Sequence, residues 1–362
     1  MGKVKNISIK NFRNFQSCDL SFGYNCNILY GDNGSGKTNI LECISLIGKG
    51  RGFRNANIKN LIYKNEFNFN ISSDYEYNSN LYKLNISSLN THKNYKKILS
   101  VNEDTSRETI EFLDSSVSLL YFLPEMERLF LSSPSNRRNF IDKLIFSEKK
   151  NYNKLVNKYK KSLIERNKLL QLEEYDKSWI DKIEHDIADF GIEIYNLRAR
   201  QISIINQNLK LIINFKKYPF EFQISILDPF YSENLNIEIY KKKLVELREI
   251  DKMIGGSRVG PHKFDFKANV NNIFDASQLS TGQQKTLVLM LLISQCKYLV
   301  NLNKIKPILL FDEICSHLDN INRKILLDLI QEFDLQLFIT GTEKSLFSFI
   351  STNANFYNIT DL

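Results

Sequence analysis

Gly31-Asp32-Asn33-Gly34-Ser35-Gly36-Lys37-Thr38 is the most informative stretch of this chain. It has the spacing Gly-x-x-x-x-Gly-Lys-Thr, in which the backbone N–H groups of a glycine-rich loop surround a phosphate. In this spacing, Lys37 reaches the β- and γ-phosphates and the Thr38 hydroxyl ligates Mg²⁺. The stretch therefore predicts a site for ATP and Mg²⁺.

The sequence on either side of this loop fits the same interpretation. Residues 27–30 form a short apolar run typical of a buried strand, and residues 38–47 have apolar side chains at helical spacing. A strand, a glycine-rich loop and a helix, in this order, form the context that a phosphate-binding loop requires. The local pattern therefore supports a nucleotide site.

A second motif, Ile308-Leu309-Leu310-Phe311-Asp312-Glu313, joins an apolar run to two carboxylates. The apolar run predicts a buried strand, and its carboxyl end is the edge at which ligands bind in open α/β sheets. We expect Asp312 to hold Mg²⁺ and Glu313 to orient and deprotonate an attacking water. The motif is common by itself, but beside a phosphate-binding loop it indicates ATP hydrolysis.

A third motif, Leu279-Ser280-Thr281-Gly282-Gln283-Gln284-Lys285, precedes a helix that is apolar almost all round. Such a helix must be buried. Ser280 stands at an N-cap position with Gln283 three residues later, which is capping-box spacing. Taken alone, this motif favours a well-capped core helix without a functional role.

The wider pattern predicts an α/β protein with an inserted helical lobe. The C-terminal third alternates helices and buried strands, which indicates a parallel sheet; the expected elements are a helix at about 282–300, a strand at 308–311, a helix at 320–332 and a last core strand at 336–340. Residues 64–105 read as antiparallel strands, with disorder as the alternative. Residues 135–215 are helical in pattern and strongly charged, and residues 237–250 are expected to form a further helix. We expect an ATP-binding head of residues 1–130 and 253–362 and a helical arm of residues 131–252.

Composition limits the class of protein. A chain of 362 residues is long enough for about two domains. The net charge of +8 favours a polyanionic partner, either nucleic acid or an acidic membrane surface, although abundant Lys and Asn alone would also produce it. The five cysteines form no paired motif and are expected to be buried and reduced. No apolar run approaches the ~20 residues that span a bilayer, so we expect a cytoplasmic protein without a membrane partner.

The three motifs, in this order, resemble those of the ABC-type ATPase superfamily. The loop at 31–38 resembles its Walker A motif, residues 279–285 its signature motif and residues 308–313 its Walker B strand. Residues 316–319 resemble the D-loop that follows. Asn33 and Asn39 resemble the chromosome-maintenance and DNA-repair branch, also called SMC-like, more than the transporters.

Three further stretches resemble the RecF family: Ile9–Phe15, Ser133–Asp142 and Arg258–Lys263. The resemblance runs from end to end of the chain. It implies an ATP-dependent DNA clamp that acts in recombinational repair and replication of gapped DNA, with weak DNA-dependent ATPase activity. The implied partners are gapped duplex, single-/double-strand junctions, and the proteins RecR and RecO.

The resemblance also implies that the nucleotide site is shared between two copies of the chain. ATP held by Lys37 and Thr38 of one copy would be covered by Ser280 and Gly282 of the other, giving a head-to-tail homodimer that hydrolysis releases. Ser280 would then act in catalysis together with Lys37 and Glu313. The implied nucleotide-binding residues are Gly31, Asp32, Asn33, Gly34, Ser35, Gly36, Lys37, Thr38, Asn39, Arg13 and Gly282.

Some positions depart from the family pattern or leave alternatives open. Residues 121–125 contain no equivalent of the glutamine loop, so Glu125 is the candidate there, and the switch residue falls at Thr340 or Thr342. His262 is expected to be structural, and the lysine cluster at 149–161 is either a solvated helix face or a DNA groove. A transport ATPase subunit and a non-hydrolysing scaffold are the alternative functions.

Overall fold

The computed structural model describes residues 2–48, 50–91, 94–216, 221–271, 273–301, 303–315, 320–350 and 354–360. The chain divides into two compact units, one of residues 1–127 and 281–362 and the other of residues 128–280. Residues 253–280, which we expected in the head, belong to the second unit. The reason is strand pairing, because β10 (Phe266–Val270) pairs with β9 (Phe222–Ile226) of that unit.

The first unit contains a sheet of five strands in the order β14-β4-β13-β12-β8, and every neighbouring pair is parallel. The strands are β4 (Cys26–Tyr30), β8 (Leu119–Phe122), β12 (Ile308–Phe311), β13 (Leu337–Gly341) and β14 (Ala354–Asn358). The predicted parallel sheet is confirmed. The predicted last core strand at 336–340 is confirmed as β13, and β14, which was not predicted, follows it. β14 is a half-exposed edge strand, so its sequence lacks the apolar run that marks β12.

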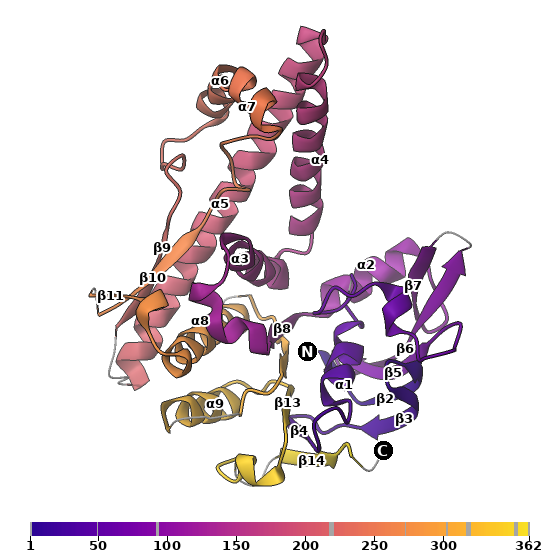
Figure 1. Ribbon diagram of the computed structural model, residues 1–362. Coiled ribbons are helices and arrows are strands. Elements are labelled where there is room, and N and C mark those ends of the chain that lie inside the picture. The colour runs from indigo at the N-terminus through magenta and orange to yellow at the C-terminus, as the bar shows by residue number, and fades with distance from the viewer. Residues whose placement is uncertain are drawn as a thin grey trace. The chain divides into compact units, whose positions relative to one another are not determined.

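Helices cover both faces of the parallel sheet. α8 and α9 lie on one face, and α1 lies on the other (Figure 1). α8 is buried around most of its circumference, as its apolar sequence predicted. The bounds are α1 (Lys37–Ser45), α8 (Thr281–Asn301) and α9 (Asn320–Glu332), with short 3₁₀ helices at Ile58–Leu61 and Lys344–Phe347.

A second, antiparallel sheet of six strands packs beyond α1 in the same unit (Figure 1). Alternation places Ile7 and Ile9 of one strand in the core. Antiparallel strands at 64–105 are confirmed. The strands are β1 (Gly2–Val4), β2 (Asn6–Phe12), β3 (Phe15–Ser21), β5 (Asn70–Tyr77), β6 (Asn80–Thr91) and β7 (Asn94–Val101), followed by α2 (Arg107–Ser116).

The second unit is built on a long helix, α5, along which α4 packs (Figure 1). The helix expected at 237–250 is two helices, α6 and α7, separated at Leu247, whose ψ of 1° interrupts the helical run. The helices are α3 (Pro134–Glu148), α4 (Tyr152–Leu170), α5 (Lys177–Lys216), α6 (Ile237–Glu246) and α7 (Arg248–Ile254); β11 (Phe274–Asp275) and two 3₁₀ segments, Pro124–Leu131 and Ala276–Gln278, complete the elements outside the first two sheets.

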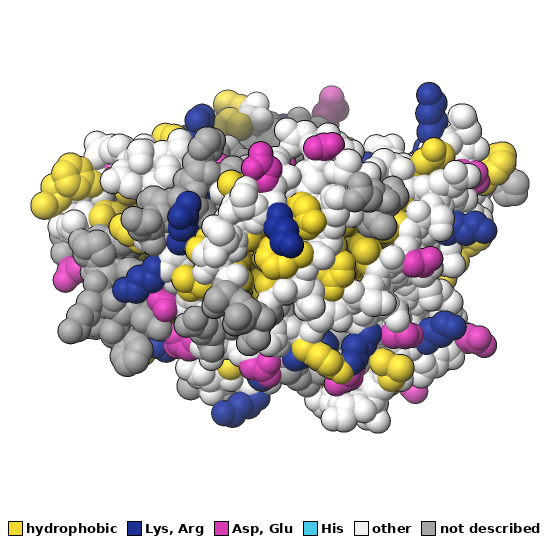
Figure 2. Space-filling view, turned by 90° about the horizontal axis from the view of Figure 1, so that it is seen from below, with side chains coloured by type: hydrophobic (Ala, Val, Ile, Leu, Met, Phe, Trp, Pro, Cys, Tyr) yellow, Lys and Arg dark blue, Asp and Glu magenta, His cyan; other side chains and the backbone are white. Residues whose placement is uncertain are grey.

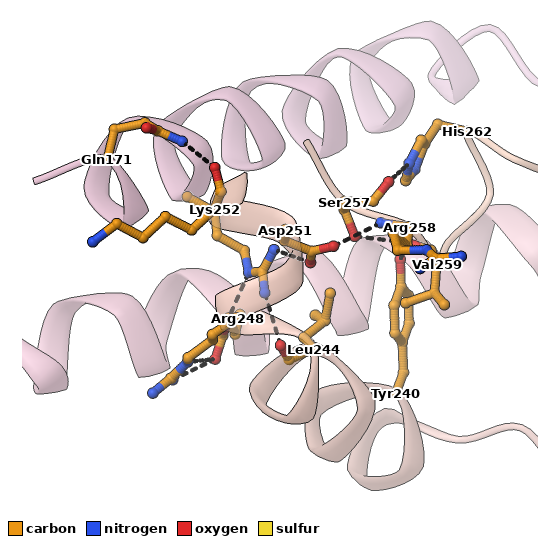
Figure 3. A network of polar contacts seen from close by, with 12 residues as sticks. Gln171, Tyr240, Leu244, Arg248, Asp251, Lys252, Ser257, Arg258, Val259 and His262 are labelled. Carbon is orange, nitrogen blue, oxygen red and sulfur yellow. Dashed lines mark hydrogen bonds and ion pairs between the residues drawn. The ribbon is translucent and has the colours of Figure 1, made fainter. Parts of the chain in front are cut away.

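Buried ion pairs join α4, α5 and α7. The Arg166 guanidinium, only 2% exposed, donates to Glu184 at 2.8 Å and to Asp251 at 2.7 Å. Arg248 also pairs with Glu184, and Asp251 accepts from the backbone N–H of Arg258 at 3.0 Å (Figure 3). A buried charge is tolerated when it is paired and hydrogen-bonded, so this cluster fixes α7 and the chain after it against α4 and α5.

No helix of the described ranges is both long and apolar enough to cross a membrane.

Candidate nucleotide site

The phosphate-binding loop joins β4 to α1, as its sequence predicted. Gly34 and Gly36 have φ values of 86° and 107°, in the region that side chains other than glycine rarely adopt. A Cβ at Gly36 would also lie 2.5 Å from the ring of Phe15. These glycines therefore permit a turn that places successive backbone N–H groups on its inner side, at the N-terminus of α1.

Two side chains of the loop fit a phosphate ligand. The Lys37 ammonium donates to the carbonyl oxygens of Gly31 and Asp32, each at 2.7 Å, and burial lowers its pKa. The Ser35 hydroxyl is buried and has no hydrogen-bond partner within the described chain. Buried polar groups are normally paired. A bound phosphate would supply both the missing partner and the counter-charge.

Thr38 and Asp312 meet at the edge of the parallel sheet. The Thr38 hydroxyl donates to Oδ1 of Asp312 at 3.0 Å, although the residues lie far apart in the sequence. Burial raises the pKa of the Asp312 carboxyl, against the hydrogen bonds from Thr340 and Thr38 that lower it. A cation at this position would stabilise the ionised carboxylate. The donor set of a hydroxyl and a carboxylate therefore fits Mg²⁺.

Thr340 connects Asp312 to Glu313. Its hydroxyl donates to Oδ1 of Asp312 at 2.8 Å and accepts from the backbone N–H of Glu313 at 2.8 Å. Glu313 has a φ of 50°, a strained conformation for a residue other than glycine that costs about 1–3 kcal/mol. Thr340 is buried at the end of β13, whereas Thr342 is exposed. The geometry thus distinguishes the two threonines that the sequence left open.

Arg13 lies beside α1 but its guanidinium is occupied by protein groups. Nε and Nη2 donate to the two carboxylate oxygens of Glu42 at 2.8 and 2.9 Å, and Nη1 donates to the carbonyl of Asn60 at 2.9 Å. Glu42 is fully buried on α1. Arg13 therefore fixes the β2–β3 turn to the phosphate-loop helix, and its predicted contact with nucleotide stays a prediction.

Asn39 and Arg54 form a second layer of contacts on α1. The Asn39 amide donates to Asn14 at 2.7 Å, and the Asn14 amide donates to the carbonyl of Ser35 in the loop at 3.1 Å. Arg54 Nη1 lies 3.3 Å from the Asn39 amide oxygen and 3.6 Å from Glu42, and its charge lowers the pKa of Asp312. Sequence reasoning missed Arg54. The signal was the run Arg51-Gly52-Phe53-Arg54, two cations around a glycine directly after the phosphate-loop helix.

The signature residues lie at the start of α8. Ser280 and Gly282 are both exposed, and a Cβ at Gly282 would meet nothing within 4 Å. Ser280 belongs to the second unit and Gly282 to the first. Lys285, one turn later, is buried and pairs with Glu127 at 2.7 Å. The start of α8 is therefore exposed, while the following turn is fixed in the first unit.

Other predicted positions have simpler outcomes. Glu125 is exposed just after β8. The D-loop stretch at 316–319 lies outside the described residues. All five cysteines are buried and free, as expected. The described ranges contain no group of three or more His, Cys, Asp or Glu side chains that could hold a metal ion. A cation beside Thr38 and Asp312 would take its remaining ligands from phosphate and water.

The comparisons with known proteins agree over almost the whole chain. The family described as RecF/RecN/SMC N terminal domain matches residues 3–361. A DNA replication and repair protein RecF of Rickettsia akari is 33% identical over 351 residues, which cover 94% of each chain. The chain belongs to the RecF family. A second RecF, of Rickettsia conorii, is 32% identical over 346 residues with the same coverage.

Solved structures of RecF family members have the same fold. The recombination mediator protein RecF of the RecFOR pathway, in its ATP form, has a TM-score of 0.83 and 28% identity, and covers 99% of this chain and 96% of its own. Its ATPγS form gives the same TM-score at 27% identity, with 99% and 97% covered. An SMC head bound to the C-winged helix domain of ScpA is 16% identical, with a TM-score of 0.56 and 96% and 91% covered, and shares the fold alone. The predicted α/β ATPase head of the SMC-like branch is confirmed.

Proposed function

We propose that this protein is an ATP-dependent DNA-binding clamp in the repair and replication of gapped DNA. The observation that carries the proposal is the hydrogen-bonded series Thr38–Asp312–Thr340–Glu313 beside the phosphate loop, whose Ser35 hydroxyl has no partner within the described chain. Family members with the same architecture are named DNA replication and repair proteins and have ATP forms. A nucleotide site in such a family supports control of DNA binding by ATP.

Different side chains would bind the phosphates, hold Mg²⁺ and activate the attacking water. The loop N–H groups, Ser35 and Lys37 bind the phosphates and offset their negative charge. Thr38 and Asp312 would hold Mg²⁺, which offsets charge that develops on the phosphate oxygens. Glu313 follows Asp312 directly, and its carboxylate would orient water and accept a proton from it. The Thr340 hydroxyl accepts the 2.8 Å hydrogen bond from the backbone N–H of Glu313, so this hydroxyl would fix the position of the proposed base.

The exposed start of α8 supports a shared site. Ser280 and Gly282 of one copy would cover the nucleotide held by Lys37 of another, giving a head-to-tail homodimer. The positive end of α8 would be attracted to the γ-phosphate, and this attraction is lost after hydrolysis. Nucleotide state would then control dimerisation, and DNA at gaps and single-/double-strand junctions would be held or released accordingly. RecR and RecO are the proposed protein partners, since RecF relatives belong to the RecFOR pathway.

Sedimentation of the full chain in ATP and in ADP, with and without gapped duplex, tests the proposal. We expect a monomer in ADP, a dimer in ATP and co-sedimentation of the dimer with gapped DNA. Intact duplex without a gap is the matched control for DNA structure. Equal sedimentation in the two nucleotides, with no DNA bound in either, would overturn the clamp.

The variant Glu313→Gln separates a slow ATPase from a non-hydrolysing scaffold. Glutamine keeps the size of the side chain but cannot accept the proton, so hydrolysis should fall by about 100-fold or more while the ATP-bound dimer accumulates. Phosphate release, measured with and without DNA, reads out the change. If the parent chain released no phosphate in either condition, the scaffold function would replace the ATPase, and unchanged turnover in the variant would remove Glu313 from the base role.

A further inference from the structure

Two of the family-specific stretches meet in the second unit, away from the phosphate loop in sequence. Arg137, in the first turn of α3, binds both oxygens of Asp265 at 2.7 Å, and Arg138 donates to the carbonyl of Phe264 at 2.8 Å. Arg198 of α5 binds both oxygens of Asp142 at 2.9 Å. The contacts of Arg137 and Arg138 join the start of α3 to the segment 257–265, which we call the GPH segment.

Hydrogen bonds and close packing hold the GPH segment in one conformation. His262 donates from Nε2 to the carbonyl of Ser257 at 2.8 Å (Figure 3), and its Nδ1 accepts from the Tyr159 hydroxyl at 2.8 Å. Gly260 has a φ of 128°, and a Cβ there would lie 2.0 Å from the Tyr240 hydroxyl. Both ring nitrogens of His262 are therefore engaged in the fold. A rigid segment can hold a binding group in place without an ordering cost.

Three arginines and two aspartates are in contact at this junction. Asp142 and Asp265 are each engaged by one arginine, Arg198 and Arg137, in a two-oxygen contact. Arg138 is half-buried and has a carbonyl as its one partner, without a carboxylate, among the described residues. Burial lowers the pKa of Arg138 and the charge of Arg198 lowers it further, while the charges of Asp265 and Asp142 oppose this change. An arginine in such surroundings is stabilised by an added anion.

Lys263 adds a second cation at the same place. Its side chain is exposed, one residue before the carbonyl that Arg138 contacts. Burial lowers the pKa of His262, and the charges of Lys263 and Arg138 lower it further, against the hydrogen bond to Ser257 and the charge of Asp251. On the face shown in Figure 2, Lys and Arg side chains are interspersed with Asp and Glu among the residues drawn in colour.

We propose that Arg138 and Lys263 form a phosphate-binding site on the second unit, distinct from the phosphate loop. An arginine presents a planar fork of donors that suits a phosphate, and a lysine adds a point charge. The phosphate has two possible sources, the backbone of DNA or the nucleotide of a second copy. Both arms rest on the proposed function, the DNA arm on its DNA binding and the nucleotide arm on its ATP-dependent pairing of two copies.

The experiment compares the full chain with Arg138→Gln and Lys263→Gln. In the DNA arm, duplex binding is titrated at several salt concentrations. Each lost phosphate contact should weaken binding regardless of sequence and reduce the slope of log K against log salt by about one. In the nucleotide arm, ATP affinity and ATP-dependent sedimentation are measured without DNA.

Matched variants make each result decisive. Lys267→Gln removes the same charge from an exposed position on β10 of the same unit and should leave both arms unchanged. Arg138→Lys keeps the charge and should restore most of the salt slope. Lys263→Gln alters an exposed side chain only, so it tests the site even if Arg138→Gln unfolds. Weaker duplex binding in the DNA arm identifies DNA as the source of the phosphate. Weaker ATP binding or ATP-dependent sedimentation in the nucleotide arm identifies the nucleotide. If Lys263→Gln behaves as Lys267→Gln does in both arms, the site is overturned.

Discussion

Thr340 carries a prediction that the sequence alone could not make. Its hydroxyl holds both the Asp312 carboxylate and the Glu313 N–H, so Thr340→Val leaves that N–H without its partner. Losing a partner costs a buried group about 1–3 kcal/mol. Since about 1.4 kcal/mol is tenfold in rate, we expect the hydrolysis rate to fall by about tenfold or more. Phosphate release at saturating ATP measures the effect.

Thr342→Val is the matched control for this prediction. Thr342 lies two residues away and is exposed. Thr342→Val changes the side chain in the same way, so the hydrolysis rate of this variant should equal that of the parent chain. Thr340→Ser keeps the hydroxyl and should retain most activity. If the two valine variants hydrolyse ATP at the same rate, Thr340 does not position Glu313.

Single residues show where sequence reasoning succeeds and where it stops. Thr38 and Asp312 were predicted to act together, and the structure places them 3.0 Å apart, because each motif fixes its residue to the same edge of the sheet. The choice of Thr340 over Thr342 depends on the pairing of Phe311 with Ile339, and no local pattern encodes that register. Arg54 was missed for the same reason, since its contacts with Asn39 and Glu42 arise only in the folded chain.

At the scale of elements, the C-terminal end of α1 carries the next prediction. This helix has no basic residue in its own last turn. Lys97 of β7 supplies the cation, donating to the carbonyls of Leu46 at 2.9 Å and Gly48 at 2.7 Å. Desolvation lowers the pKa of Lys97 to about 8, with Asp114 opposing the change. A cation at a helix C-terminus stabilises the helix, and this helix carries Lys37 at its other end.

Lys97→Met should destabilise the protein by about 1–3 kcal/mol, because two carbonyls lose their donor. Between pH 8 and the ordinary pKa of lysine, the unfolded chain binds a proton that the folded chain has lost, so the free energy of unfolding of the parent chain gains from rising pH. The variant lacks this gain. The stability difference between them should therefore widen from pH 7 to pH 9.5, as measured by urea unfolding, and a difference that narrowed over this range would contradict the lowered pKa.

Whole elements were predicted well where one face of the element, or all of it, is buried in the core. The predicted strand at 308–311 and helix at 320–332 match β12 and α9, because their apolar runs have clear ends. β14 was missed because it lies at the edge of the sheet, where its Asn-rich sequence stays half-exposed. The break at Leu247 was missed because apolar spacing continues across it from α6 to α7.

At the scale of the whole molecule, the position of residues 253–280 illustrates the limit of composition. Gly255-Gly256 and Gly260-Pro261 mark the end of a helical region in the sequence, but they do not show which unit the chain then joins. Strand pairing between β9 and β10, and the contact of Arg137 with Asp265, place the segment in the second unit. As a result the signature motif crosses between units at Ser280 and Thr281.

The last prediction concerns the assembly of two chains. Ser280 is exposed at the start of α8, so Ser280→Arg should not disturb the fold or the phosphate loop. An arginine there would separate the start of α8 from the nucleotide of a second copy. We expect ATP affinity to equal that of the parent chain, while the ATP-induced dimer and the hydrolysis that depends on it are lost.

Equilibrium sedimentation in ATP, beside an ATP-binding titration, distinguishes this loss from a failure of nucleotide binding. Ser348→Arg places the same charge and bulk on an exposed serine of the first unit, after the last 3₁₀ helix, and should dimerise normally. Ser280→Ala removes only the hydroxyl and should weaken the dimer less than arginine does, because the backbone end of α8 still faces the partner. A Ser280→Arg chain that dimerised as the parent does would show that the nucleotide is not covered by α8 of a second copy, and the site built on Lys37, Asp312 and Glu313 would then have to be complete within one chain.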